Sequence, residues 1–201
     1  MSEQPVTRIV IPLIGIALVC ILILGVVDSV TQEKIADNAR RHELPMLGAL
    51  MPLDFDNDLF SDVLEVIEPA YFGSDHTVSV YRARKNNEPV GVVISPVVAK
   101  GYSGLIKLGV GIAKDGSILS VQVIDHQETE GLGDGIDQNK SDWITQFNGR
   151  SLDNTPVDGW AITSEGGQID QLSGATISSR TVINAVRKTL EFYGSSSDRL
   201  Y

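Results

Sequence analysis

The chain has 201 residues, of which 42% are hydrophobic and 21% are charged, so it can form one membrane segment and one compact folded domain. Its formal net charge of −10 argues against a nucleic-acid partner, because an acidic surface repels phosphate backbones. The single cysteine, Cys20, excludes an intrachain disulfide and an iron–sulfur cluster held by this chain alone.

An apolar segment follows the N-terminal tail (1–8). Residues 9–27 carry no charge, and a helix of this length is about 28 Å long, close to the hydrocarbon thickness of a bilayer. The segment is longer than a signal-peptide core of about 7–15 residues, and no small-residue cleavage site follows it. We therefore predict a single transmembrane anchor in contact with membrane lipid, with a cleaved signal peptide as the alternative. The flanking basic residues, counted alone, would place the following domain in the cytoplasm, but long domains can cross the membrane despite such charges, so the orientation stays open.

The next part of the chain is predicted to be helical and then irregular. Residues 28–52 are expected to form a helical stalk, whose weak apolar stripe ends near Pro45. Residues 53–60 are acidic and irregular, and one or two helical turns are predicted over Ser61–Ile67.

The middle of the chain has the pattern of a β-sheet. Strands are predicted at 77–84, 90–98, 107–113 and 118–124. Asn86-Asn87 and Asp115-Gly116 mark tight turns between successive strands, so the pairing is predicted to be mostly antiparallel.

Helices are predicted in the last third of the chain. Residues 142–147 are expected to form a short helix, and a long final helix is expected to end at Gly194. The final helix has one apolar face, made by Val182, Ala185, Val186, Leu190 and Tyr193. The predicted fold class is therefore α+β, with the transmembrane helix followed by a domain (53–201) that has a mostly antiparallel sheet and flanking helices.

A cluster of hydroxyl groups lies at the start of the final helix, in the run Asp170-Gln171-Leu172-Ser173-Gly174-Ala175-Thr176-Ile177-Ser178-Ser179. The small residues Gly174 and Ala175 let a ligand approach the backbone, and the N–H groups of a helix start favour a phosphate. Asp170, just upstream, could hold a metal or help to deprotonate a hydroxyl. From local physics, a helix N-cap at Ser173, Thr176 or Ser178 is the commoner interpretation, while a phosphate site or a nucleophilic hydroxyl remains open.

The pattern D-x-x-S-G-A-T-x-S-S resembles the attachment motif of the covalent FMN-binding domain family. This resemblance implies that flavin mononucleotide (FMN) is joined to Thr176 by a phosphoester bond, which a flavin transferase makes from FAD. It also implies that Ser178 and Ser179 lie near the phosphate. The segment recognised by the transferase would comprise Asp170, Ser173, Gly174, Ala175 and Thr176. Of these, Ser173, Gly174 and Ala175 are also expected to bind the cofactor.

Two further segments resemble the same family. His126–Gly133 has the form H-x-E-T-x-G-L-G, and Gly101–Gly104 has the form G-Y-x-G. Without the resemblance, the first would be an acidic turn after a strand and the second an ordinary glycine turn. No metal site is predicted, because the acidic turn offers no further soft ligand. By resemblance, the cofactor-binding residues here would be Tyr102, Glu128, Thr129 and Leu132.

The layout of an anchor plus one domain resembles the G subunit of the Rnf (or Rsx) ion-translocating electron transport complexes. This implies an electron-transfer subunit, incomplete as an enzyme alone, of a translocase that couples ferredoxin–NAD electron transfer to ion transport. The other subunits and the flavin transferase would be its partners, and the FMN domain would lie on the periplasmic side of a bacterial inner membrane. Two alternatives stay open: a component like the C subunit of a sodium-translocating NADH–quinone reductase, and a non-redox membrane-anchored scaffold or sensor.

Overall fold

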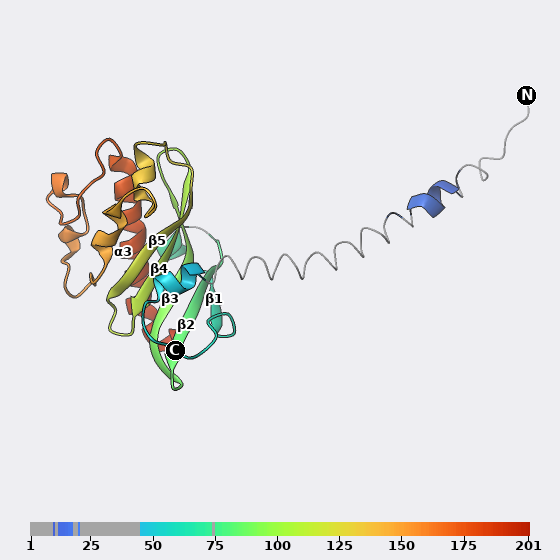
Figure 1. Ribbon diagram of the computed structural model, residues 1–201, viewed down its shortest axis with the longest axis horizontal. Coiled ribbons are helices and arrows are strands. Elements are labelled where there is room, and N and C mark those ends of the chain that lie inside the picture. Colours follow the sequence, from blue (N-terminus) through green and yellow to red (C-terminus); the bar gives the residue numbers. More distant parts are fainter. Residues whose placement is uncertain (1–9, 11, 18–19, 21–44, 74) are drawn as a thin grey trace, which may run out of the picture. The chain divides into compact units, whose positions relative to one another are not determined.

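The computed structural model describes residues 10, 12–17, 20, 45–73 and 75–201 (Figure 1). The chain divides into two units, residues 1–46 and Leu47–Tyr201. Among the described residues, no helix combines the length and the apolar character needed to cross a membrane. Most of the predicted anchor (9–27) and stalk (28–52) lies outside the described residues, and within the stalk residues 45–50 are helical.

The second unit is built on a five-stranded antiparallel sheet with the strands in chain order (Figure 1). The two predicted turns form as expected, because Asn86 and Asn87 have φ angles of 51° and 68° and Gly116 has a φ of 84°. The four predicted strands and their antiparallel pairing are confirmed. The five strands of the sheet are β1 (Val63–Val66), β2 (Val78–Lys85), β3 (Glu88–Lys100), β4 (Leu105–Ala113) and β5 (Ile118–His126), of which β2 to β5 are the predicted ones.

The prediction of helical turns over Ser61–Ile67 is wrong, because β1 lies there. Val63 pairs with Tyr81 and Val66 pairs with Val78, at the edge of the sheet. Four residues are too few to show a strand periodicity, and pairing with β2 decides their conformation. A short helix, α2 (Pro69–Phe72), follows this strand.

The long helix α3 (Thr176–Leu200) covers one face of the sheet and packs on β3 and β4 (Figure 1). All five residues of its predicted apolar face are buried in the main core. The predicted end at Gly194 is wrong, because the helix continues to Leu200, which is buried and extends the apolar packing. Gly194 itself is exposed and does not adopt a positive φ.

Four short 3₁₀ helices lie between β5 and α3. The predicted helix at 142–147 is one of them, and its N-cap Ser141 accepts a hydrogen bond from the backbone of Trp143. The four are η1 (Gly133–Ile136), η2 (Asp142–Phe147), η3 (Val157–Gly159) and η4 (Thr163–Glu165).

The end of the predicted stalk packs on the sheet at glycine positions. Leu47, Leu50 and Met51 are buried, although they do not belong to the main core cluster. A Cβ atom on Gly111 of β4 would lie 1.8 Å from the carbonyl oxygen of Leu50, and one on Gly109 would lie 2.5 Å from the Leu50 side chain. The absence of side chains at these positions lets the segment approach the sheet closely.

We predict that Gly111→Ala destabilises the domain by about 1–3 kcal/mol, because the new methyl group must displace the backbone of Leu50. Gly194→Ala is the matched control. Apart from its chain neighbours and its own helix backbone, no described atom lies within 4 Å of a Cβ at this helical position, so the same substitution should stabilise the domain by up to about 1 kcal/mol. Urea unfolding of the purified variants measures both effects. Equal stability of Gly111→Ala and the wild type would contradict the close packing of Leu50.

Candidate functional site

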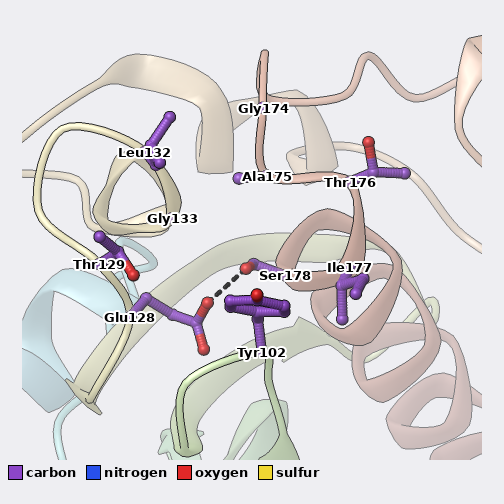
Figure 2. A pocket seen from close by; sticks show the side chains of 10 residues that line it. All are labelled: Tyr102, Glu128, Thr129, Leu132, Gly133, Gly174, Ala175, Thr176, Ile177 and Ser178. Carbon is purple, nitrogen blue, oxygen red and sulfur yellow. Dashed lines mark hydrogen bonds between the residues drawn. The ribbon is translucent and has the colours of Figure 1, made fainter.

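A pocket of about 370 Å³ lies where three segments meet (Figure 2). These are the loop between β3 and β4, the turn after β5, and the first turn of α3 with the loop before it. The volume falls in the range of small-molecule sites, roughly 300–1,000 Å³. The lining residues are Tyr102, Glu128, Thr129, Leu132, Gly133, Gly174, Ala175, Thr176, Ile177 and Ser178.

The start of α3 offers unpaired backbone donors to this pocket. Ala175 is the N-cap residue and makes no side-chain capping bond, which contradicts the N-cap interpretation of the neighbouring hydroxyls. Within the described chain, no hydrogen bond engages the backbone N–H groups of Thr176, Ile177 and Ser178. Such donors, together with the helix dipole, make a favourable environment for an anion.

Gly174 is required by the loop that enters the helix. Its φ of 77° lies in the left-handed region, and a Cβ atom here would lie 2.9 Å from a methyl group of Leu132. A side chain at this position would therefore be strained and would also reduce the space between the two walls of the pocket.

The three hydroxyl groups of the first turn have different environments. Ser178 is buried and donates a hydrogen bond of 2.5 Å to Glu128 Oε2. Ser179 is buried, donates to Ala175 O and accepts from the backbone of Leu172. Thr176 is half-buried, and its hydroxyl makes no hydrogen bond to any residue that the structure describes. Figure 2 shows this hydroxyl directed away from the Glu128–Ser178 pair, so it alone of the three is free to form a new bond.

Glu128 forms a buried anionic wall of the pocket, with an exposed fraction of 7%. In addition to the bond from Ser178, its Oε1 accepts a hydrogen bond of 3.1 Å from the backbone of Ser103. A Cβ atom on Gly101 or Gly133 would lie 2.2 or 2.8 Å from its carboxylate oxygens, so both glycines are needed to admit it. Glu128 thus connects the three segments that form the pocket.

The mouth of the pocket is apolar and accessible. Tyr102, Leu132 and Ile177 have exposed fractions of 72%, 50% and 47%. Figure 2 shows that they come from the three different segments that line the pocket. Aromatic and aliphatic side chains of this kind can contact a flat apolar ring system.

The structure places the predicted residues in two groups. Eight line the pocket, namely Tyr102, Glu128, Thr129, Leu132, Gly174, Ala175, Thr176 and Ser178. Three lie outside the lining: Asp170, Ser173 and Ser179. Gly133 and Ile177 also line the pocket and were not predicted to do so. Gly133 ends the H-x-E-T-x-G-L-G segment, and Ile177 is an apolar residue between two hydroxyl residues of the attachment motif. Their places in these two motifs could therefore have indicated that they line the pocket.

Similarity to known proteins agrees with this site. The family described as FMN-binding domain matches residues 101–191, which include every lining residue. The fold is similar to the crystal structure of Shewanella oneidensis NqrC, with a TM-score of 0.50 and 21% identity over 72% of this chain and 74% of that chain.

Two relatives with similar sequences have the same name. The chain is 40% identical to the G subunit of the ion-translocating oxidoreductase complex of Pseudoalteromonas atlantica, over 85% of this chain and 80% of the relative. It is 36% identical to the G subunit of the same kind of complex from Shewanella amazonensis, over 90% of this chain and 85% of the relative. These relatives confirm the resemblance predicted from the motifs. The chain belongs to the family of G subunits of ion-translocating oxidoreductase complexes and contains an FMN-binding domain.

Proposed function

We propose that this chain is an electron-transfer subunit that carries FMN as a phosphoester on Thr176. The observation that carries this proposal is the hydroxyl of Thr176, which has no hydrogen-bond partner among the described residues and lies beside N–H groups that likewise lack one there. When bound, FMN supplies one- and two-electron transfer chemistry, and the protein supplies placement and electrostatics. The relatives are named as G subunits of an ion-translocating oxidoreductase complex, and this supports the redox role.

The residues of the pocket fit the parts of FMN. The phosphate suits the backbone donors of the first turn of α3, where Gly174 and Ala175 leave space near the backbone. The ring system suits the apolar mouth, formed by Tyr102 and Leu132 on two sides.

A covalent bond suits this pocket because, among the described residues, backbone N–H groups but no cationic side chain line it to hold a free phosphate. Glu128 is the only charged residue in the lining that the structure describes, and no lysine or arginine accompanies it. A dissociable FMN dianion would lack a cationic partner and would be held weakly. An ester retains the cofactor whatever its affinity, and leaves the exposed mouth available for a redox partner.

The ester would form by transfer from FAD. The hydroxyl of Thr176 loses its proton, its oxygen bonds to the phosphorus of the FMN half, the pyrophosphate P–O bond breaks, and AMP leaves. We assign recognition by the flavin transferase to Asp170, Ser173, Gly174, Ala175 and Thr176. Of these, Asp170 and Ser173 lie outside the pocket lining, where another protein can reach them. Ser178 and Ser179 support the phosphate site from the first turn of α3.

We place the chain in a bacterial inner membrane, with the tail at 1–8, the anchor at 9–27, the stalk at 28–52 and the FMN domain at 53–201 on the periplasmic side. Its partners are the other subunits of a translocase that couples ferredoxin–NAD electron transfer to ion transport. The relatives named as G subunits favour this assignment over the alternative related to the C subunit of the quinone reductase, and the FMN-binding match favours it over a non-redox scaffold.

Mass spectrometry of the full chain tests the proposal. Co-expressed with a flavin transferase, the intact chain should gain the mass of FMN less one water. After proteolysis, the added mass should be found on the peptide containing Thr176. A chain produced in the same cells without the transferase is the control and should have the mass of the polypeptide alone. An unmodified chain under both conditions would refute the phosphoester.

A further inference from the structure

Two side chains of η2 hold the backbone of Asp170. The Trp143 indole Nε1 donates a hydrogen bond of 2.6 Å to Asp170 O. The Gln146 amide makes two more, because its Nε2 donates to Asp170 O at 3.3 Å and its Oε1 accepts from Asp170 N at 2.8 Å. Both backbone polar groups of Asp170 are therefore fixed by side chains of η2, an arrangement that we call the η2 clamp.

The η2 clamp is itself held by the core. Trp143 packs edge-to-face on the fully buried Phe147, with ring centroids 5.6 Å apart. The Gln146 amide also donates to Trp143 O, and Arg150 Nε donates to Gln146 O at 2.8 Å. Both clamp side chains are thus oriented before any ligand arrives.

The clamp holds the backbone of Asp170 and leaves its side chain free. The Asp170 carboxylate is exposed and has no hydrogen bond or ion pair with another residue in the described part of the chain. Two residues further along the same loop, the Leu172 N–H donates to Ser179 Oγ at 3.0 Å. The first part of the loop that leads to Thr176 is therefore fixed at Asp170 and at Leu172, with one carboxylate presented to solvent.

We propose that Gln146 and Trp143 are positioning residues that present the Asp170 carboxylate to a cationic group of the enzyme that attaches the flavin. This inference rests on the proposed function and extends it to residues outside the attachment motif. A carboxylate held in place loses little conformational freedom when it is recognised, whereas a carboxylate on a loose loop loses more. The clamp acts through Asp170 and does not touch the flavin.

The test compares three variants with the wild type as acceptors of FMN from FAD and purified flavin transferase. Gln146→Met keeps the length of the side chain and removes both bonds to Asp170. We expect it to lower kcat/KM for the acceptor about tenfold, as the loss of one or two hydrogen bonds would. Trp143→Phe removes one bond and keeps the aromatic packing, so its effect should be smaller. Thr145→Ala is the matched control, because among the described residues this neighbouring side chain bonds only Asp142 O. Its kcat/KM should stay within about twofold of the wild-type value.

Two further readouts separate positioning from general stability. In an Asp170→Asn background, Gln146→Met should have little additional effect on esterification, because the carboxylate that it positions is already absent. Hydrogen exchange at the Asp170 amide should become faster in Gln146→Met and remain slow in Thr145→Ala, a measurement that needs no flavin.

Unchanged kcat/KM in Gln146→Met would overturn this inference, as would an equal loss in Thr145→Ala or an undiminished effect in the Asp170→Asn background. An ester on the wild-type chain would show in that case that the proposed function itself still holds. Failure of the wild-type chain to acquire any ester would overturn both.

Discussion

Thr176→Ala should abolish covalent FMN and leave the domain folded. The substitution removes the oxygen that the phosphoester needs, whereas the hydroxyl makes no hydrogen bond that the described residues would lose. We therefore expect the stability of the flavin-free domain to change by no more than about 0.5 kcal/mol, as for a typical surface substitution. Flavin fluorescence of the denatured chain in a gel measures attachment, and thermal unfolding of the flavin-free protein measures stability.

Thr176→Ser is the matched control, because it keeps a hydroxyl at the same position and should retain a fluorescent band. The nearest hydroxyl in the preceding loop belongs to Ser173, which lies outside the pocket lining. A fluorescent Thr176→Ala band would contradict the assignment, and peptide mapping would then show whether Ser173 carries the flavin.

The long strands and the final helix were predictable because their patterns are local. β2 to β5 are joined by turns with asparagine or glycine signals, and α3 carries a regular apolar face. In contrast, β1 depends on pairing with β2, and the sequence of four residues does not reveal this. The continuation of α3 past Gly194 likewise depends on the burial of Leu200, which is a tertiary effect.

The pocket shows the same division between local and distant information. The motif indicated Thr176, whereas local physics alone favoured an N-cap, and the structure was needed to show that Ala175 occupies that position without a side-chain bond. The contact between Glu128 and Ser178 joins residues 50 positions apart, so no pattern in either segment could predict it. The η2 clamp joins Asp170 to residues 24 and 27 positions away in the sequence, so it could not be predicted from a local pattern either.

The charge of Glu128 should lower the midpoint potential of the bound flavin, and Glu128→Gln should raise it. A unit charge about 8 Å from a second charge contributes roughly 2 kcal/mol at an effective dielectric constant near 20. That energy corresponds to on the order of 90 mV for one electron. We therefore expect a positive shift of several tens of millivolts in a redox titration. Glutamine keeps the shape of the side chain and can still accept from the backbone of Ser103.

The control for this charge is Glu130→Gln. Glu130 is exposed and does not line the pocket, so solvent and salt screen its charge and the potential should change much less. Equal shifts in the two variants would contradict a special role for the buried carboxylate. No shift in Glu128→Gln would show that the position carries no charge when the flavin is present.

Glu128→Ala separates the charge of this residue from its structural role. Alanine removes the same charge, and it also leaves the buried hydroxyl of Ser178 and the backbone N–H of Ser103 without their acceptor. An unsatisfied buried polar group costs about 1–3 kcal/mol, so the flavin-free domain should lose stability that Glu128→Gln retains.

The carboxylate of Glu128 joins the three segments around the pocket, so its loss should also loosen the mouth and increase the motion of the attached ring. Lower flavin fluorescence anisotropy would measure this motion. We expect the midpoint potential to rise in both variants, and the losses of stability and of ring immobilisation to occur only in Glu128→Ala. That result would show that Glu128 has both an electrostatic and a structural role.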